Sequence, residues 1–304
     1  MSKITIIGAG HVGSHCAYTL AVRGICGEIV MIDTNRGKCD ANAKDVADGI
    51  SYFPAAVKVR TGDYTDCTDS DIIAISIGKP REPGQTRLDV MYDSVRMLKD
   101  VCENLKKIDI KGIIISITNP ADVIADYVRK ALDMPRERCF STGTALDTAR
   151  LVRTVGELAE VDPKSVSAFS MGEHGNSSMI PFSCMTIGGL PFDDWGLSRD
   201  VILERTREIG NEIIEGKGST EFGIGTAFAD MVKAILFDEK RIMPASVLLC
   251  GEYNQIDVHA GVPCIIGKNG IEKIIELPIT ESEWEEFNAS CDVLRKHISK
   301  AAAV

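Results

Sequence analysis

Residues that could move a proton or bind a carboxylate lie close together in the middle of the chain. Asp147 and Arg150 are three residues apart, so on a helix their side chains project from one face. His174 lies in the glycine-flanked segment Gly-Glu-His-Gly, and an imidazole can donate or accept a proton near neutral pH. Taken singly, such a histidine is more often structural, and an Asp–Arg pair is usually a solvated ion pair on a helix surface.

Two more arginines follow a predicted buried strand. Arg81 and Arg87 lie in a loop rich in Gly and Pro that covers residues 78–87, directly after the predicted strand 72–77. Loops at the carboxyl ends of parallel strands are where α/β sheets hold ligands. Because the formal net charge is −10, local arginines would have to attract an anionic substrate against the field of the whole protein.

A glycine pattern near the N-terminus predicts a dinucleotide site. Gly8, Gly10 and Gly13 follow the first predicted strand, where they allow a tight turn, close approach of a pyrophosphate and close packing of helix on strand. The N–H groups that open the helix then face the phosphates. Asp33 ends the second predicted strand 20 residues after Gly13, and a carboxylate there favours NAD over NADP. A nucleotide-sensing module without chemistry would carry the same pattern.

The elements that must position these residues alternate between short β-branched runs and helical stretches. We predict strands at residues 4–7, 28–32, 58–60, 72–77, 112–117 and 139–141, and helices at 11–23, 36–50, 87–107 and 121–132. Strands that alternate with helices pair in parallel through right-handed crossovers. Their apolar character indicates strands covered on both faces. The first half therefore predicts an α/β fold with a Rossmann doubly wound parallel sheet.

The second half changes rhythm. We predict helices at 145–159, 199–215, 222–236 and 281–301, with strands at 166–170, 180–187, 247–250 and 264–267. This pattern predicts an α+β domain that binds the substrate and carries the catalytic residues. We therefore place an NAD-binding Rossmann domain at residues 1–143 and a catalytic domain at residues 144–304.

Composition argues against several classes of partner. The chain has 44 acidic and 34 basic residues, without a basic run that could displace counterions from nucleic acid. Its apolar runs are too short to cross a membrane and no signal-peptide pattern opens it, so we expect a cytoplasmic protein. The ten cysteines include no C-x-x-C pair, which favours reduced thiols and predicts no metal site.

Several of these motifs occur together, in one order, in a known family. The glycine fingerprint, the loop ending in Thr-Arg-Leu at 86–88, Thr-Asn-Pro at 118–120, and the segments 146–150 and 172–175 resemble the L-lactate/malate dehydrogenase family. The likeness runs from the first strand to the final helix. Glu173 and the Thr-Gly-Thr approach to Asp147 are closest to the lactate and L-2-hydroxyisocaproate branches. The resemblance implies an NAD-dependent enzyme that moves a hydride to or from C2 of a small 2-hydroxy acid.

The resemblance also implies a role for each polar residue. His174 would exchange a proton with the substrate oxygen, and Asp147 would orient the imidazole and stabilise its protonated form. Arg150 would hold the substrate carboxylate through a bidentate contact, which a lysine could not reproduce. Arg87 would stabilise charge that develops on the carbonyl oxygen. Asn119 would hydrogen-bond the substrate or the cofactor.

Further binding residues and an assembly follow from the same resemblance. Thr220 and Arg81 would join Arg150 and Asn119 around the substrate. The cofactor NAD would contact Gly8, Gly10, His11, Val12, Gly13, Asp33, Ile77, Gly78, Thr118 and Asn119. The family forms homodimers or homotetramers, and helix 36–50 is one candidate contact surface. Val152 and Ser167 replace the Arg and His of members that fructose 1,6-bisphosphate activates, so we expect no such activation.

Two signals conflict on the identity of the substrate. Arg81 stands six residues before Arg87, where the family usually has glutamine in lactate enzymes and arginine in malate enzymes. Glu173, Thr220 and Ile224 are instead lactate-like. We therefore expect an L-lactate dehydrogenase, with a malate dehydrogenase acting on oxaloacetate as the alternative. A non-catalytic NAD-binding regulator, and an NAD-dependent glycosidase that would need Cys and His metal ligands, are less favoured.

Overall fold

The computed structural model describes residues 2–78 and 87–304, with the backbone alone for residues 87–89. The predicted site residue Arg81 and the side chain of Arg87 therefore lie outside the described residues. Their roles stay predictions from the sequence.

Six parallel strands form the centre of the fold, as the sequence predicts. They are β1 (Lys3–Ile7), β2 (Glu28–Ile32), β3 (Lys58–Thr61), β4 (Ile72–Ile75), β5 (Ile113–Ser116) and β6 (Cys139–Ser141). Their order in space is β3-β2-β1-β4-β5-β6, which is the doubly wound arrangement. β1 and β4 are neighbours, with Ile7 opposite Ile75. The direction of winding reverses between these two strands, and such sheets bind ligands at that point.

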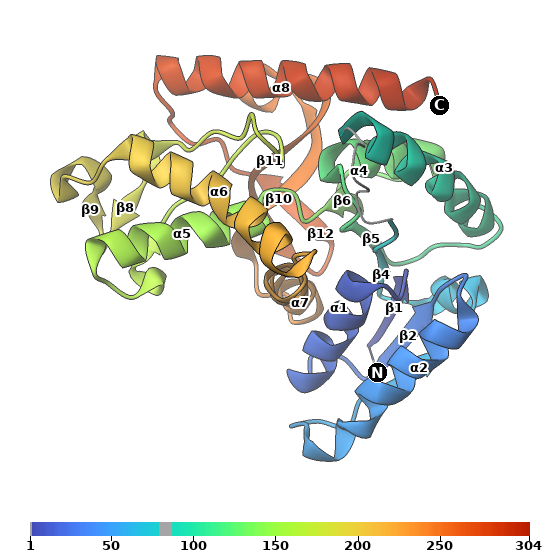
Figure 1. Cartoon of the computed structure of the whole chain (residues 1–304). Helices are drawn as coiled ribbons and strands as arrows, with labels where there is room; N and C mark the ends of the chain where they lie inside the picture. Colours follow the sequence, from blue (N-terminus) through green and yellow to red (C-terminus); the bar gives the residue numbers. More distant parts are fainter. Residues whose placement is uncertain (1, 79–86) are drawn as a thin grey trace.

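Four helices cover the parallel strands. They are α1 (His11–Val22), α2 (Arg36–Asp48), α3 (Arg87–Leu105) and α4 (Ala121–Ala131), and each ends within two residues of its predicted end. α1 packs against α2, and α3 packs against α4 (Figure 1). Between the helix layers, isoleucines such as Ile4, Ile6 and Ile72 are fully buried. Each such side chain stabilises the fold by about 2 kcal/mol relative to an exposed one.

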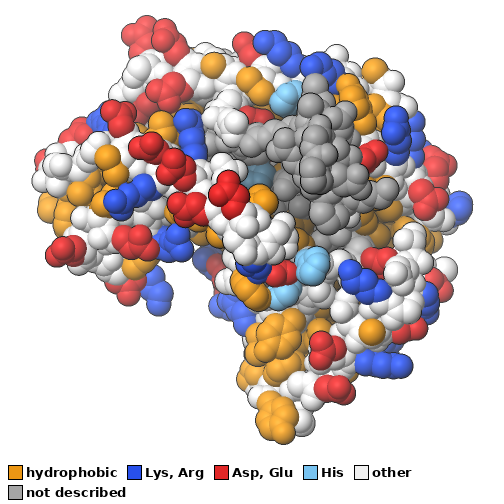
Figure 2. Space-filling view, in the orientation of Figure 1, with side chains coloured by type: hydrophobic (Ala, Val, Ile, Leu, Met, Phe, Trp, Pro, Cys, Tyr) orange, Lys and Arg blue, Asp and Glu red, His pale blue; other side chains and the backbone are white. Residues whose placement is uncertain are grey.

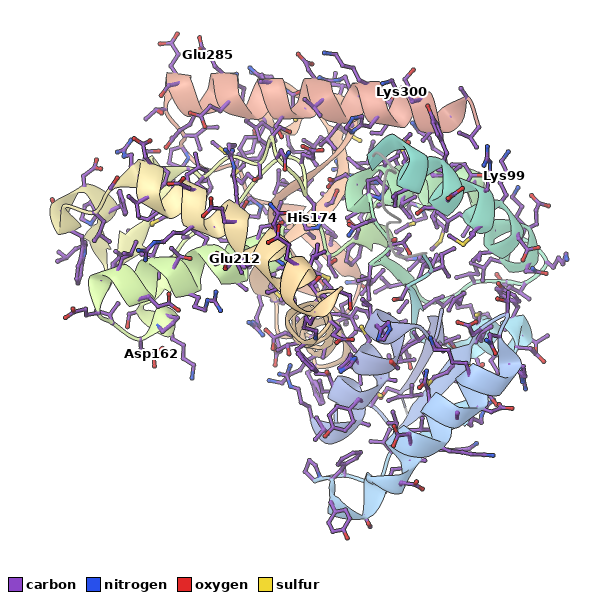
Figure 3. All side chains as sticks on the ribbon, viewed as in Figure 1. Lys99, Asp162, His174, Glu212, Glu285 and Lys300 are labelled. Carbon is purple, nitrogen blue, oxygen red and sulfur yellow. The ribbon has the colours of Figure 1, made fainter. Side chains whose placement is uncertain are left out.

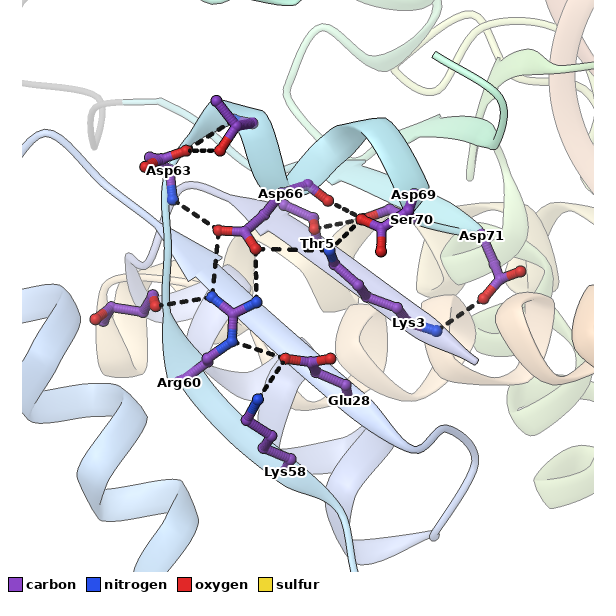
Figure 4. Close-up of polar contacts among 12 residues, drawn as sticks. Lys3, Thr5, Glu28, Lys58, Arg60, Asp63, Asp66, Asp69, Ser70 and Asp71 are labelled. Atoms are coloured by element: carbon purple, nitrogen blue, oxygen red, sulfur yellow. Dashed lines mark hydrogen bonds and ion pairs between the residues drawn. The ribbon is translucent and has the colours of Figure 1, made fainter. Parts of the chain in front are cut away.

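A polar network secures the outer edge of the parallel sheet (Figure 4). Arg60 of β3 lies 2.7 Å from Glu28 of β2 and 2.5 Å from Asp66. Lys3 of β1 bonds to Asp69 and lies 3.5 Å from Asp66. The hydrogen bond from Arg60 lowers the pKa of Asp66 to about 2, so this carboxylate is charged at neutral pH. The network joins three strands to the short helical turn that carries both aspartates.

The second half of the chain adds three antiparallel strands to the same sheet. They are β10 (Arg241–Cys250), β11 (Ile256–Gly267) and β12 (Gly270–Ile274). β10 joins β6 where Ser246 pairs with Ser141. The sheet therefore has nine strands, in the order β12-β11-β10-β6-β5-β4-β1-β2-β3. The two halves of the chain thus share one sheet, which the change of rhythm in the sequence did not predict.

The β10–β11 hairpin is also much longer than the sequence indicated. The apolar pattern predicted strands only at 247–250 and 264–267, because Pro244 and Pro263 interrupt it. In the structure these two prolines face each other across the β10–β11 pair. Proline cannot donate a ladder hydrogen bond. Since both prolines occupy one position of the ladder, the loss is confined there and the hairpin continues on either side.

A separate small sheet lies at the left of the view in Figure 1, away from β1 and β2. It consists of β7 (Val166–Ser167), β8 (Thr186–Ile187) and β9 (Leu190–Pro191). The predicted strands 166–170 and 180–187 were both too long. In the second, Pro181 precedes a short helical turn at Phe182–Cys184 and cannot donate a ladder hydrogen bond, so the strand is confined to Thr186–Ile187. Between β7 and β8 the chain forms isolated bridges, one of which joins Gly172 to Gly261 of β11. The segment that carries His174 is therefore a supported loop and not a strand.

Four helices complete the second half. They are α5 (Ala145–Ala159), α6 (Arg199–Lys217), α7 (Phe222–Leu236) and α8 (Glu281–Ala302). α7 packs against α1, and α5 packs against α6. α8 runs along the top of the view in Figure 1 and packs on α4 and β11. Thr280 and Glu283 form a capping box that begins α8.

The cysteines of this protein are thiols, as the composition favours. All ten cysteines are free, and eight of them are buried. Burial raises the pKa of Cys16 and Cys139 far above the usual value, so these thiols stay protonated at neutral pH.

Among residues 2–78 and 87–304, no helix is both long and apolar enough to cross a membrane.

We expect Gly143→Ala to destabilise the junction between β6 and α5. Gly143 has a φ of +48°, and a Cβ built on it would lie 2.5 Å from the backbone nitrogen of Ser246. Backbone strain and this collision should together lower the free energy of unfolding by about 2–4 kcal/mol, measured by urea denaturation. Gly188→Ala is the matched control, because Gly188 has a φ of +60° with open space around it. Equal losses in both variants would contradict the expected collision.

Candidate active site

His174, Asp147 and Arg150 form one cluster of contacts. Nδ1 of His174 lies 2.5 Å from Oδ2 of Asp147, and Nη1 of Arg150 lies 3.4 Å from Oδ1 of the same carboxylate. The side chains of Arg150 and Asp147 are 13% and 15% exposed. This is therefore not a solvated pair on a helix surface. Figure 3 shows His174 near the centre of the molecule, among segments from both halves of the chain.

Asp147 controls the protonation of His174. Its charge raises the pKa of His174 to about 9, although burial acts in the opposite direction. Burial also acts to raise the pKa of Asp147, but the charge and the hydrogen bond of His174 hold it below its usual value. At neutral pH the imidazole is therefore a cation. Its Nδ1–H donates to Asp147, and its Nε2–H is the group that can donate a proton to a substrate.

A second carboxylate, which sequence reasoning missed, lies behind His174. Asp122 in the first turn of α4 accepts a hydrogen bond of 2.9 Å from the backbone N–H of His174. Asp122 is 1% exposed, and burial raises its pKa to about 6. Its place just after the Thr-Asn-Pro motif was the only signal in the sequence. A contact between residues 52 positions apart has no local pattern that would reveal it.

Close approaches of glycine support the loop that carries His174. The backbones of Gly172 and Gly261 exchange hydrogen bonds of 2.9 and 2.8 Å. A Cβ built on Gly172 would lie 2.3 Å from the hydroxyl of Ser290 in α8, which accepts a hydrogen bond of 2.8 Å from the backbone N–H of Glu173. The side chain of Glu173 accepts hydrogen bonds from the backbone and the hydroxyl of Ser177. The loop is thus held by β11, by α8 and by its own turn.

The glycine fingerprint has the shape of a phosphate-binding turn. Gly8 has a φ of +102°, and a Cβ on Gly13 would lie 1.8 Å from the carbonyl oxygen of Gly8, so α1 packs directly on the turn. Around Gly10 there is open space, and no side chain caps α1. His11 and Val12 begin the helix, with the His11 side chain 70% exposed. The first N–H groups of α1 therefore face a space that fits a pyrophosphate.

Asp33, directly after β2, contacts this turn and is therefore not an unrelated surface residue. Its Oδ2 accepts a hydrogen bond of 2.8 Å from the N–H of Ala9, and its Oδ1 accepts one of 2.8 Å from the N–H of Asn35. Each carboxylate oxygen has a further lone pair for a ribose hydroxyl. Arg36, which could have favoured a 2′-phosphate, donates to the carbonyl of Gly62 at 2.8 Å. The residues present therefore fit the ribose of NAD.

Contacts at the carboxyl ends of β4 and β5 lie between this turn and His174. The N–H of Ile77 donates to the hydroxyl of Thr118 at 2.9 Å. The hydroxyl of Ser94 donates to the carbonyl of Asn119 at 3.0 Å. Gly78 follows Ile77 and is exposed. α4 begins at Ala121, two residues after Asn119, and carries Asp122, whose carboxylate accepts a hydrogen bond from the backbone of His174.

The turn between α6 and α7 lies beside the catalytic helix α5. Gly210 of α6 faces Arg150, since a Cβ built on it would lie 3.1 Å from Nη1 of the guanidinium. Gly223 of α7 faces Leu146 in the same way, with a distance of 2.8 Å. Thr220 lies in the turn between these helices and is half-buried. The sequence contained no sign that Gly210 leaves room for Arg150.

The arrangement is suited to acid–base chemistry on a small anion. A protonated imidazole and a guanidinium share one half-buried carboxylate, so a proton donor and an anchor for a carboxylate lie side by side. Among the side chains that the structure describes, no group of three or more His, Cys, Asp or Glu residues is placed to hold a metal ion.

Comparison with protein families matches both halves of the chain. Residues 2–141 match the NAD-binding domain of lactate/malate dehydrogenases. Residues 144–304 match the α/β C-terminal domain of the same family.

Individual relatives are similar over almost their whole length. The chain is 39% identical to L-lactate dehydrogenase 1 of Bifidobacterium longum, over 97% of this chain and 96% of that protein. It is 38% identical to L-lactate dehydrogenase of Fusobacterium nucleatum, with the same coverage. Among solved structures, a minor L-lactate dehydrogenase from Enterococcus mundtii is 33% identical, with a TM-score of 0.95 over 98% of both chains. A lactate dehydrogenase from a deep-sea metagenome also has a TM-score of 0.95, at 31% identity over 99% of both chains.

We expect the imidazole of His174 to titrate at a pH of about 9. Asp147→Asn should move the midpoint well below 9, because the largest charge that raises the pKa is gone while burial still lowers it and only Asp122 still raises it. NMR of histidine-labelled protein measures both midpoints, and His174→Asn identifies the signal among the five histidines. Asp126→Asn is the matched control, because Asp126 contacts a different buried histidine, His259, at 3.1 Å. A wild-type midpoint near 6.5 would contradict the role given to Asp147.

Proposed function

The chain belongs to the lactate/malate dehydrogenase family, and we propose that it acts as an NAD-dependent L-lactate dehydrogenase, which interconverts L-lactate and pyruvate. The relatives of 38–39% identity that match nearly the whole chain carry this name.

One observation carries the assignment of the catalytic residues. His174 and Arg150 both contact Asp147, at 2.5 and 3.4 Å. In a 2-keto acid the carbonyl group to be reduced is bonded directly to the carboxylate. A proton donor for the carbonyl oxygen and an anchor for the carboxylate must therefore lie side by side, as these two cations do.

In this mechanism each residue of the cluster has one task. Arg150 binds the substrate carboxylate through its guanidinium fork. Nε2 of His174 donates a proton to the carbonyl oxygen during reduction, and accepts it from the hydroxyl group during oxidation. Asp147 keeps the imidazole oriented and stabilises its charged form. NAD held at the Gly8–Gly13 turn would supply the hydride acceptor for C2 of lactate, and NADH held there would supply the hydride for pyruvate.

Further residues complete the proposed site. Asn119 and Thr220 contact the substrate, and Arg87 stabilises the negative charge that develops on the carbonyl oxygen. The side chain of Arg87 is outside the described residues, but its backbone begins α3, which is the next described element after β4. Asp33 and the Gly8–Gly13 turn hold the ribose and the pyrophosphate of NAD.

Malate dehydrogenase activity is the second candidate, and Arg81 is the observation that favours it. A guanidinium beside the substrate would pair the second carboxylate of oxaloacetate, which would be costly to bury unpaired. Arg81 is outside the described residues, so its support comes from the sequence alone. The names of the relatives favour lactate.

We also propose a cytoplasmic homodimer or homotetramer with a domain division at residue 143. The family models meet between residues 141 and 144, which supports this division. Tyr18 and Tyr52, which flank the predicted contact helix α2 in the sequence, are 48% and 89% exposed. Burial of exposed aromatic side chains of this kind is a common source of stability in oligomer interfaces.

We expect His174→Asn to lower kcat by about three orders of magnitude, because the proton donor is lost. The dissociation constant for NADH should stay nearly unchanged, since the cofactor turn is untouched. Steady-state kinetics and NADH fluorescence titration measure the two quantities. Asp292→Asn, at an exposed position of α8, is the control and should retain wild-type turnover. Full activity in His174→Asn would remove this residue from the mechanism.

We expect kcat/KM to be higher for pyruvate than for oxaloacetate in the wild type. Arg81→Gln should lower the remaining use of oxaloacetate by roughly tenfold, because its second carboxylate loses a partner. Arg96→Gln is the control, since Arg96 is an exposed arginine of α3. If oxaloacetate is preferred and Arg81→Gln inverts that preference, the enzyme is a malate dehydrogenase.

A further inference from the structure

Glu221 connects the cofactor helix with the turn that carries Thr220. It follows Thr220 directly, and its side chain is 10% exposed. Its Oε1 accepts a hydrogen bond from Lys217, the last residue of α6. Its Oε2 accepts no hydrogen bond from the described residues but lies 3.3 Å from Nδ1 of His15 and 3.4 Å from Nδ1 of His11, both in α1. Nδ1 of His15 is also 2.8 Å from the carbonyl oxygen of His11. One carboxylate therefore faces an ammonium group on one helix and two imidazoles on another.

The contact with Lys217 closes the turn. Gly218 ends α6 with a φ of +85°, and its N–H donates to the carbonyl of Ile214 at 2.8 Å. Lys217 and Glu221 then enclose residues 218–220 as an ion pair four residues apart. The two ends of the turn are thus held together by side chains as well as by the helix cap. The hydrogen bond from Lys217 lowers the pKa of Glu221, which keeps the carboxylate charged at neutral pH.

Phe222 holds the charged groups in position. Its ring meets the ring of His15 edge-on, with 4.7 Å between centroids, and the ammonium of Lys217 lies 4.0 Å from its centroid. An edge-on ring contact and a cation over an aromatic face are both favourable. Phe222 is 62% exposed, so this group of side chains lies at the surface. In Figure 2 histidine side chains on this face lie beside acidic and basic atoms.

α1 and α7 pack closely against each other and together support the 218–220 turn. Gly225 of α7 lies against the backbone of His15, where an added Cβ would come within 3.4 Å. The first turn of α1 also provides the N–H groups that face the pyrophosphate site. Glu221 and the residue before it therefore lie against the helix that carries these N–H groups.

We propose, on the basis of the function proposed above, that Glu221 is a positioning residue for the substrate. Through His11, His15 and Lys217 it fixes the 218–220 turn, with Thr220, against the cofactor end of α1. The 218–220 turn and the cofactor end of α1 are thereby coupled mechanically. Glu221 itself touches neither the substrate nor the reacting atoms.

The first test separates substrate affinity from chemistry. Glu221→Gln keeps the shape of the side chain and an acceptor for Lys217, but removes the charge. We expect the KM for pyruvate to rise roughly fivefold while kcat changes less than twofold, since the acid–base cluster is untouched. The matched control is Glu239→Gln, because Glu239 pairs with Lys233 at 2.8 Å beyond the opposite end of α7. Equal KM values in these two variants would overturn the proposal.

A double-mutant cycle tests the connection with α1. His15→Asn removes one imidazole that faces Glu221 without changing a residue assigned to cofactor or substrate. If the two side chains act together, the rise in KM of the combined variant is smaller than the product of the single effects. Rises in KM that simply multiply would show that Glu221 acts without His15, and would contradict the proposed coupling.

A further measurement is independent of activity. Amide hydrogen exchange across residues 218–222 should be roughly threefold faster or more in Glu221→Gln and in Lys217→Met, and unchanged in Glu239→Gln. Unchanged exchange in the first two variants would overturn the role of Glu221, whichever substrate the enzyme uses. A wild type that reduces no 2-keto acid would instead overturn the proposed function, and the exchange rates would still decide whether Glu221 holds the turn.

Discussion

The contact between Asp147 and His174 is the interaction on which the rest of the site depends. Burial alone would favour a neutral imidazole, which carries only one ring proton. With that proton on Nδ1, facing Asp147, Nε2 would have no proton to donate. The carboxylate at 2.5 Å reverses this preference and raises the pKa of His174 to about 9. Arg150 shares the same carboxylate, so the anchor for an anion and the donor of a proton are positioned together. Arg150 and the protonated His174 therefore present two cations to a carboxylate substrate, and both contact Asp147.

The fold holds this contact from three directions. α5 carries Asp147 and Arg150 on one face, while α4 presents Asp122 to the backbone of His174. The β10–β11 hairpin holds the loop through the paired backbones of Gly172 and Gly261. These supports come from both halves of the chain, because the hairpin extends the sheet that the first half began. The proposed domain division therefore crosses a continuous sheet, and the catalytic loop lies where the two parts meet.

The Gly8–Gly13 turn and the turn between α6 and α7 are both part of the proposed site, but different elements hold them in place. The Gly8–Gly13 turn lies at the point where the sheet reverses its winding, next to the end of β4. The α6–α7 turn lies beside α5 and is tied to α1 by Glu221. In a protein with a net charge of −10, Arg150 and the protonated His174 set the local field that an anionic substrate meets.

The sequence by itself determined the parallel sheet, the fingerprint with Asp33, and the pairing of Asp147 with Arg150. Each of these depends on residues close in the chain or on a repeating apolar pattern, which leaves a local signal. Only the tertiary structure decided that Asp122 lies behind His174, that Pro244 and Pro263 lie opposite each other within a long hairpin, and that Glu221 faces α1. Those contacts join residues tens to hundreds of positions apart. Their partners are chosen by how the helices and the sheet pack, and no local pattern records that choice.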